Sequence, residues 1–227
     1  MGTPLPSREE QVAEVLDRLH AEYPDATISL DFSNRLELVV AVVLSAQCTD
    51  ARVNETTPDL FEKYQTPGDY ANADEAELAE DIYGITYHNQ KAGYLKGAAE
   101  TIVAEYDGEI PDTMDGLTAL PGVGRKTANV VLQHGHDVVE GIVVDTHAQR
   151  LSRRLGLTEE ETPEKIEADL MEFVPEAEWQ AYTHLLIAHG RATCTAQNPE
   201  CEGCVLEDVC PSSTVDHDVD LASGEAW

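Results

Sequence analysis

The stretch from Leu120 to Ala128, which reads Leu-Pro-Gly-Val-Gly-Arg-Lys-Thr-Ala, most constrains the fold of this 227-residue chain. Pro121 cannot continue a helix, while Gly122 and Gly124 permit a tight turn and the close approach of another molecule. Apolar residues at helical spacing precede and follow this run, so the sequence predicts two packed helices joined by a short hairpin. The free amides of the hairpin and of the second helix would form a site suited to one DNA phosphate.

Lys126 falls in the first turn of the second predicted helix, directly after Arg125. The helix dipole and the neighbouring guanidinium both disfavour the ammonium form of a lysine there. A neutral lysine amine is the nucleophile that a Schiff-base enzyme needs. The alternative is a Gly-rich turn followed by an ordinary surface lysine, but the length of the whole pattern favours a functional helix-hairpin-helix.

Four of the five cysteines form a C-x6-C-x2-C-x5-C pattern near the end of the chain. Thiolates at such spacing bind either zinc or an iron–sulfur cluster. Only Cys201 and Cys204 form a zinc-like knuckle, and Cys210 precedes Pro211 as in ferredoxin-type runs, so the spacing favours a cluster and leaves zinc as the alternative. Cys48 has no such partner, and we expect it to be a small buried hydrophobe in an apolar helix.

The formal charge of −30 opposes DNA binding, because phosphate neutralisation normally dominates affinity for DNA. Residues 117–155 are an exception, with five basic and three acidic side chains. Acidic residues spread along a whole chain that has only five lysines are typical of surfaces that stay soluble in concentrated salt. We therefore hypothesise a halophilic source and an activity that persists in molar salt.

Helical periodicity runs through almost the whole sequence, and no convincing sheet is expected. Val12, Val15, Leu16 and Leu19 form one face of a first helix. Further helices are predicted at 36–44, 50–64, 73–82, 89–106, 113–120, 125–133, 146–155, 163–173 and 178–190. Short β-prone runs at 138–139 and 142–144 read as a linker. We find no signal peptide or membrane-spanning run and expect a soluble cytoplasmic protein with no membrane partner.

Four segments together resemble endonuclease III, a family of bifunctional DNA glycosylases and AP lyases. They are Leu120–Ala128, Val144–His147, Leu44–Asp50 and the four-cysteine pattern, and the resemblance covers about residues 8 to 211. It implies an all-α, two-domain helix-hairpin-helix glycosylase fold with DNA in the cleft. A six-helix barrel would span 28–138, with the helix-hairpin-helix at about 113–134.

The second domain implied by the resemblance combines residues 1–27 with 139–211. It would hold a [4Fe-4S] cluster on Cys194, Cys201, Cys204 and Cys210. We expect residues 212–227 to be a disordered acidic tail.

The resemblance also implies the chemistry. Lys126 would attack the sugar of a flipped-out damaged pyrimidine, and Asp145 would assist it, so that the abasic site is cleaved by β-elimination through a Schiff base. Another role for Asp145 is to cap the helix that follows it, which is compatible with catalysis. The expected partner is double-stranded DNA with damaged bases or abasic sites, bound by a monomer that associates with the nucleoid through its DNA.

The further DNA contacts that we expect are Gly122, Gly124, Arg125, Gln47, Tyr87, His88, His147 and Arg191. Gln47 would fill the gap left by the flipped base, or else be a buried polar residue bonded to a helix end. Tyr87 and His88 stand where the family has an aliphatic wedge, and they would stack in the duplex or only pack the loop. His184 and His189 are more typical of core histidines.

Two other functions compete with this one. A monofunctional adenine-mismatch glycosylase shares the hairpin and the cluster, but that enzyme has no nucleophile at the position of Lys126 and has a carboxylate where this chain has Val43. A non-catalytic DNA-binding or redox-sensing iron–sulfur protein would keep the hairpin and the cysteines without needing both Lys126 and Asp145.

Overall fold

The computed structural model describes residues 7–215, which form helices and connecting loops with no β-strand among them. The contacts divide the chain into two compact units. Unit 1 takes the described residues up to Ile28 and those from Gly141 onward, and unit 2 is the continuous segment Ser29–Glu140. The predicted all-α class is confirmed, and the β-prone runs form the irregular connection into unit 1.

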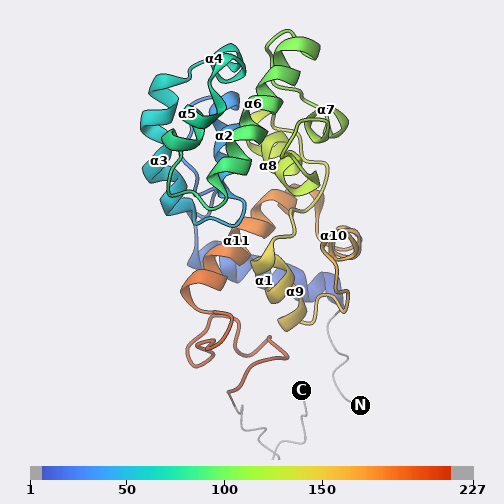
Figure 1. The fold of residues 1–227 in the computed structure, drawn as a ribbon. Coiled ribbons are helices and arrows are strands. Elements are labelled where there is room, and N and C mark those ends of the chain that lie inside the picture. Colours follow the sequence, from blue (N-terminus) through green and yellow to red (C-terminus); the bar gives the residue numbers. More distant parts are fainter. Residues whose placement is uncertain (1–6, 216–227) are drawn as a thin grey trace, which may run out of the picture. The chain divides into compact units, whose positions relative to one another are not determined.

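Unit 2 is built around the apolar helix α2 (Figure 1). Leu38 to Leu44 are all buried there, so this helix has no solvent-facing stripe, as expected for a central helix. It packs on α3, α6 and α8, while α6 also packs on α4 and α5. The helices of this unit are α2 (Arg35–Ser45), α3 (Asp50–Lys63), α4 (Pro67–Asn72), α5 (Glu75–Asp81), α6 (His88–Glu105), α7 (Met114–Thr118) and α8 (Arg125–Gly135).

Helix α4 was not predicted from the sequence, because its six residues are too few for an apolar period. Its start nevertheless has a local signature. The Thr66 side chain accepts a hydrogen bond from the amide of Asp69, the Asp69 side chain bonds back to Thr66, and Pro67 occupies the first turn. A capping box with proline just inside it marks a helix start even where periodicity gives no signal.

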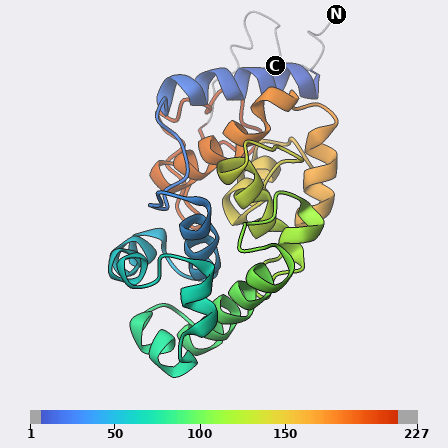
Figure 2. The ribbon, with the colours of Figure 1, turned by 90° about the horizontal axis from the view of Figure 1, so that it is seen from above.

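Unit 1 contains α1 (Arg8–Glu22), α9 (Thr146–Arg154), α10 (Pro163–Met171), the 3₁₀ turn η1 (Glu176–Glu178) and α11 (Trp179–Ala192). The predicted apolar face of α1 is buried in a core that it shares with α9, α10 and α11. Figure 2 shows α1, in dark blue, lying along the orange C-terminal helices. Two ends of the sequence therefore build one core.

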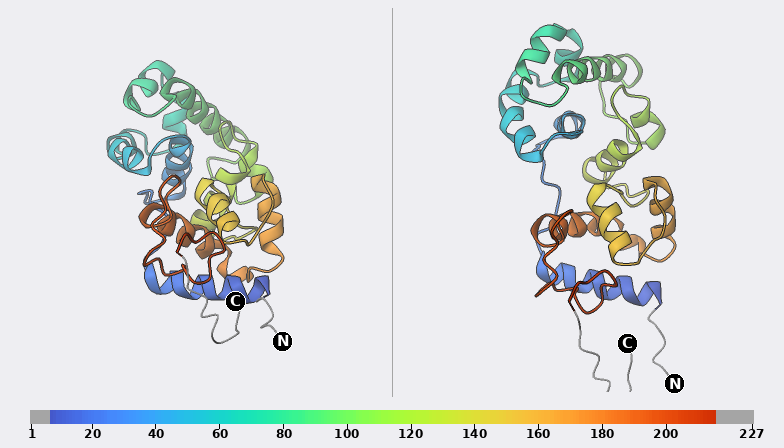
Figure 3. Two further views of the ribbon diagram at one scale, coloured as in Figure 1. Left: turned by 90° about the horizontal axis from the view of Figure 1, so that it is seen from below. Right: turned by 60° about the horizontal axis from the view of Figure 1, so that its bottom comes forward.

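Polar side chains also tie α1 to residues far along the chain. Arg8 donates to the Leu157 carbonyl at 2.8 Å and Gln11 donates to the Leu155 carbonyl at 2.6 Å. Arg18 donates to the Val205 carbonyl at 2.9 Å and forms an ion pair with Asp208 at 2.5 Å. Figure 3 shows the dark red loop that follows α11 beside the blue α1.

Three smaller expectations have different outcomes. Cys48 is only half-buried in a turn after α2, so its prediction as a buried helical residue is wrong. The predicted tail lies outside the described residues from position 216 onward. None of the helices within residues 7–215 is long and apolar enough to cross a membrane.

Candidate functional site

The predicted helix-hairpin-helix is present in unit 2, as α7, a tight turn and α8. The amide of Val123 donates to the Leu120 carbonyl at 3.1 Å, and Gly122 has a φ of +81°. A positive φ at the third residue, after a proline, is typical of a type II turn. A Cβ on Gly122 would lie 2.8 Å from the Tyr94 side chain, so both the backbone and the packing require glycine.

Helix α8 begins without a side-chain cap. Its N-cap is Gly124, which provides no side-chain hydrogen bond, and a Cβ built at this residue would meet nothing within 4 Å. The first amides of a helix have no partner within the helix and favour an anion. An uncapped helix start of this kind is suited to an oxygen of an external anion.

Lys126 is the second residue of α8 and its side chain is exposed. No hydrogen bond or ion pair joins it to another described residue, whereas the other lysines of the chain all have partners. In a chain with 44 acidic residues, this freedom is unusual. The amine of Lys126 is thus available to a molecule from outside.

Asp145 is the N-cap of α9 in unit 1. Its Oδ1 atom accepts hydrogen bonds from the amides of His147 and Ala148, both at 2.8 Å. Its Oδ2 atom lies 3.4 Å from Nδ1 of His147, and 12% of the side chain is exposed. The capping role proposed as an alternative for Asp145 is confirmed, and the carboxylate is held in one orientation while part of it stays open to solvent.

Two exposed turns in unit 2 carry Gln47 and Tyr87, with φ values of +54° and +60°. The alternative for Gln47, a buried polar residue bonded to a helix end, is wrong, since its side chain is exposed. Tyr87 is 59% exposed at the start of α6. His88 follows it and pairs edge-to-face with Tyr83, whose exposure of 78% is the largest among the large hydrophobic residues described. The sequence analysis missed Tyr83.

The other predicted contacts are less distinctive. Arg125 and Arg191 have exposed side chains, on the first turn of α8 and the last turn of α11. His184 is only half-buried, so its prediction as a core histidine is wrong, whereas His189 is 2% exposed.

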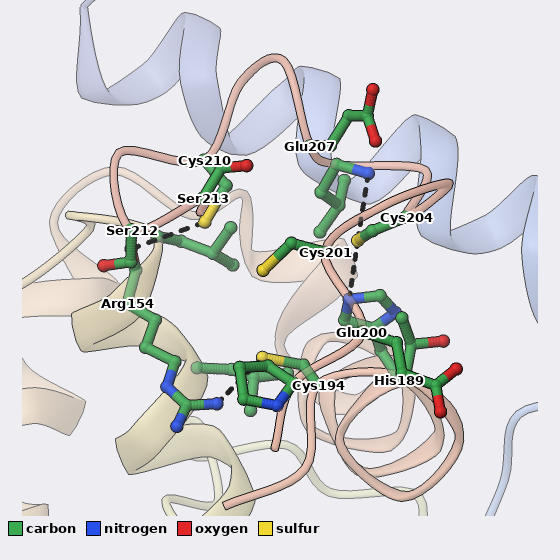
Figure 4. Close-up of a pocket in the computed structure, with 15 residues that line it drawn as sticks. Arg154, His189, Cys194, Glu200, Cys201, Cys204, Glu207, Cys210, Ser212 and Ser213 are labelled. Carbon is green, nitrogen blue, oxygen red and sulfur yellow. Dashed lines mark hydrogen bonds between the residues drawn. The ribbon is translucent and has the colours of Figure 1, made fainter. Parts of the chain in front are cut away.

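The four cysteines of the C-terminal pattern surround one cavity in unit 1, of about 220 Å³ (Figure 4). Cys194, Cys201, Cys204 and Cys210 all line it, together with Leu151, Leu155 and Leu206. Within residues 7–215 no three Cys, His, Asp or Glu side chains form a group that could hold a single metal ion. Four thiols spread around a mostly apolar cavity suit a polynuclear cluster.

Polar groups of α9, of α11 and of the cysteine loop itself lie close to these sulfur atoms. Arg154 of α9 donates to Sγ of Cys194 at 3.2 Å and to the Thr195 carbonyl at 2.7 Å. The Nε2 atom of His189 lies 3.5 Å from Sγ of Cys204, and the amide of Leu206 donates to the same sulfur at 3.4 Å. Such hydrogen bonds are typical of the surroundings of iron–sulfur clusters.

Burial raises the pKa of the Cys204 and Cys210 thiols, and the other cysteines of the loop act in the same direction. Thiolates at these positions therefore need a compensating positive charge. Iron ions would supply that charge, because a bound metal holds a coordinating thiol in its deprotonated form. The residues of the cavity fit a cluster in donor type, in lining and in charge.

The contacts of Arg154 and Lys91 were not predicted from the sequence. Both are buried or half-buried cations that bond to backbone carbonyls. No local pattern marks them, because the carbonyls that they contact come from other parts of the chain.

Comparison with known proteins places this architecture in a class. Residues 40–176 match the HhH-GPD superfamily of base excision DNA repair proteins, and residues 194–210 match the iron–sulfur binding domain of endonuclease III. Fold and site thus define a helix-hairpin-helix base excision repair protein with an iron–sulfur domain.

Curated relatives narrow this class. Endonuclease III of Synechocystis sp. is 46% identical over 92% of this chain and 95% of its own length. Endonuclease III of Bacillus subtilis is 44% identical over 88% of this chain and 92% of its own length. A solved structure of endonuclease III trapped covalently on DNA has a TM-score of 0.86 and 42% identity, covering 92% of this chain and 97% of that one. The chain belongs to the endonuclease III family.

The family supplies the activity. The chain is a base excision repair enzyme with DNA glycosylase and AP lyase activity, and its iron–sulfur domain implies a [4Fe-4S] cluster. The comparisons give no support to a halophilic source, which stays a hypothesis from composition.

Proposed function

We propose that this chain removes oxidised pyrimidines from double-stranded DNA and cleaves the resulting abasic site with Lys126 as its nucleophile. The observation that carries the proposal is that Lys126 is exposed on the first turn of α8 and has no partner among the described residues. Such a lysine can reach the sugar of a flipped-out nucleotide. A nucleotide must leave the stack because a paired base shields its C1′ atom.

In the proposed reaction, the Lys126 amine attacks C1′, the N-glycosidic bond breaks, and the base leaves with a proton. The sugar ring opens to a Schiff base between Lys126 and C1′. Loss of a C2′ proton then eliminates the 3′ phosphate, and water releases the enzyme. Asp145 provides a carboxylate that accepts a proton and stabilises positive charge on the sugar.

The hairpin and two further segments would bind the DNA itself. The uncapped start of α8 at Gly124, together with the tight turn at Gly122, supports binding of one backbone phosphate. Gln47 would occupy the space of the extruded base, and Tyr87 would enter the duplex as a wedge. Arg125, His88, His147 and Arg191 are proposed as additional contacts. We also propose that the chain acts as a monomer and that it associates with the nucleoid through its DNA substrate.

Borohydride trapping on a duplex with one thymine glycol tests the lyase assignment. Reduction of the Schiff base would join the wild-type protein covalently to the DNA, and Lys126→Ala would form no adduct. Because Lys126 has no partner among the described residues, the free energy of unfolding of Lys126→Ala should lie within about 0.5 kcal/mol of the wild-type value. An adduct that persists in Lys126→Ala, or its absence from the wild type, contradicts the assignment.

We further propose Cys194, Cys201, Cys204 and Cys210 as the ligands of the cluster, which would supply positive charge inside the cavity when bound. Their shared lining of the cavity supports this ligand set. Cys201→Ser should lose iron and acid-labile sulfide, measured by chemical analysis of purified protein. Cys48→Ser is the matched control and should keep both. Zinc in place of iron and sulfide in the wild type would refute the ligand proposal.

A further inference from the structure

Lys91, on the first turn of α6, has a buried ammonium group. Its side chain is only 4% exposed. The Nζ atom donates to the carbonyls of Leu44 at 2.8 Å and Ala46 at 2.6 Å, at the end of α2. No described carboxylate pairs with it, although the chain has 44 acidic residues. Burial lowers the pKa of Lys91, while nearby Cys48 acts in the opposite direction.

The carbonyls that Lys91 binds lead directly into the turn that carries Gln47. The amide of Cys48 donates to the Ser45 carbonyl at 3.0 Å, and Ala46 has φ −57° and ψ 115°. With Gln47 at φ +54°, this is a type II turn of the kind formed around Gly122 in the hairpin. Glutamine does not favour a positive φ, so this turn needs contacts with other parts of the chain to hold its conformation.

Lys91 also contacts the second strained turn. Its backbone amide donates to the carbonyl of Tyr87 at 3.0 Å, which is the first backbone hydrogen bond of α6 and places Lys91 one helical turn after Tyr87 whatever its side chain; Tyr87 itself lies in the left-handed region with φ +60° and ψ 35°. The other two non-glycine residues with positive φ among those described are aspartates, Asp107 and Asp137. Aspartate tolerates this conformation, whereas glutamine and tyrosine do so much less readily.

Stability alone does not account for a lysine at position 91. Removing a charge from water is costly, and replacement of a buried ion by an apolar side chain of similar size is often neutral or stabilising. What an apolar residue cannot do is hold the Leu44 and Ala46 carbonyls in one place. The Lys91 ammonium group therefore acts by fixing the geometry of the Gln47 turn.

We propose that Lys91 is a positioning residue that joins the Gln47 turn and the Tyr87 turn into one rigid element, so that both side chains enter the duplex together. This inference rests on the proposed DNA roles of Gln47 and Tyr87. It assigns to one buried cation the alignment of two exposed side chains that are distant in sequence. A small displacement of such groups is enough to slow an enzyme strongly.

Lys91→Met tests this inference, with Lys96→Met as the matched control. Lys96 lies on the same helix and also donates to two carbonyls, those of Ala71 at 2.7 Å and Ala73 at 2.8 Å, away from both turns. The single-turnover rate on a thymine glycol duplex should fall at least about tenfold in Lys91→Met. It should stay unchanged in Lys96→Met.

The second readout is the fluorescence of 2-aminopurine placed opposite a tetrahydrofuran abasic analogue. Its change on binding should be smaller in Lys91→Met at saturating protein, whereas a loss of stability alone would leave the saturated signal unaltered. Combination with Gln47→Ala completes a double-mutant cycle. The loss of rate caused by Lys91→Met should largely disappear in the Gln47→Ala background.

The proposal is overturned if Lys91→Met lowers the single-turnover rate by the same factor in the wild-type and Gln47→Ala backgrounds. It is also overturned if Lys96→Met lowers the rate as much as Lys91→Met does. If Lys91→Met does not fold, Lys91→Arg replaces it, because arginine keeps the hydrogen-bond donors but displaces the turn. Its smaller loss of single-turnover rate must also disappear in the Gln47→Ala background. A loss of rate that persists in that background overturns the proposal as well. Borohydride trapping of the wild type separately reports whether the proposed lyase function holds.

Discussion

Helices α8 and α9 begin in opposite ways. At α8, Gly124 provides no side-chain cap and Lys126 extends freely from the first turn. At α9, the carboxylate of Asp145 occupies two amides of the first turn. An open start can take an anion from outside, whereas a closed start fixes the orientation of its own carboxylate. The two proposed catalytic groups thus come from the same structural element used in two different ways.

The largest effect should come from separating the two functions of Asp145. Asp145→Asn keeps an oxygen that can cap α9 but removes the charge. We expect the single-turnover rate of base release to fall about 10²- to 10⁴-fold, as for loss of a general acid–base group. The free energy of unfolding should change little, because Asn and Asp are similar caps.

Asp145→Ala is the companion variant. It should show the same loss of rate and an additional loss of about 1 kcal/mol in unfolding free energy, measured by urea titration. Full activity in Asp145→Asn would show that Asp145 only caps the helix.

A smaller effect should follow when α8 is closed as α9 is. Gly124→Ser adds a hydroxyl that can occupy an amide of the first turn, and the structure has space for the new atoms. Stability should rise by about a few tenths of a kcal/mol. Affinity for a duplex containing tetrahydrofuran should fall about tenfold, because charge-assisted hydrogen bonds to a phosphate are lost.

Gly124→Ala is the control for this change, since it adds a Cβ without a cap. Its affinity, measured by fluorescence anisotropy, should stay near that of the wild type. Equal weakening by alanine and serine would mean that the size of the side chain, and not the open amides, determines binding.

The smallest effect concerns the other end of α8. Burial lowers the pKa of His134 and of His136 below the ordinary value of 6.5. The unfolded chain therefore binds protons below about pH 6.5 while the folded protein resists them, so stability falls as the pH falls through this value. The variant with glutamine at both positions should lose less stability between pH 7 and 5.5, measured by urea unfolding. An unchanged pH dependence would contradict this.

The sequence predicted local features well. The hairpin, the cysteine pattern and most helices depend on spacing within short segments, and they were found where expected. The directions in which long side chains extend could not be predicted in the same way. Arg150 and Arg154 counted as basic residues near the hairpin, yet both donate to carbonyls around the cysteine loop. A count of charges does not show which partner a long side chain will reach.

The left-handed backbone conformation of Gln47 and Tyr87 could not be predicted from the sequence either. Neither Gln47 nor Tyr87 is a residue type that indicates a positive φ. The carbonyls around the Gln47 turn are bound by the side chain of Lys91, which lies more than 40 positions away in the sequence. Tertiary contacts of this kind outweigh the local preference of the chain.

The place of α1 in unit 1 affects how the chain is made. Its bonds to Leu155, Leu157 and Val205 join residues that lie at least 144 positions later in the sequence. Unit 2 is continuous and can fold as soon as it leaves the ribosome. The apolar face of α1 must wait uncovered until α9, α10 and α11 have been synthesised. Nascent chains that stall before α11 would therefore expose α1 to chaperones and proteases.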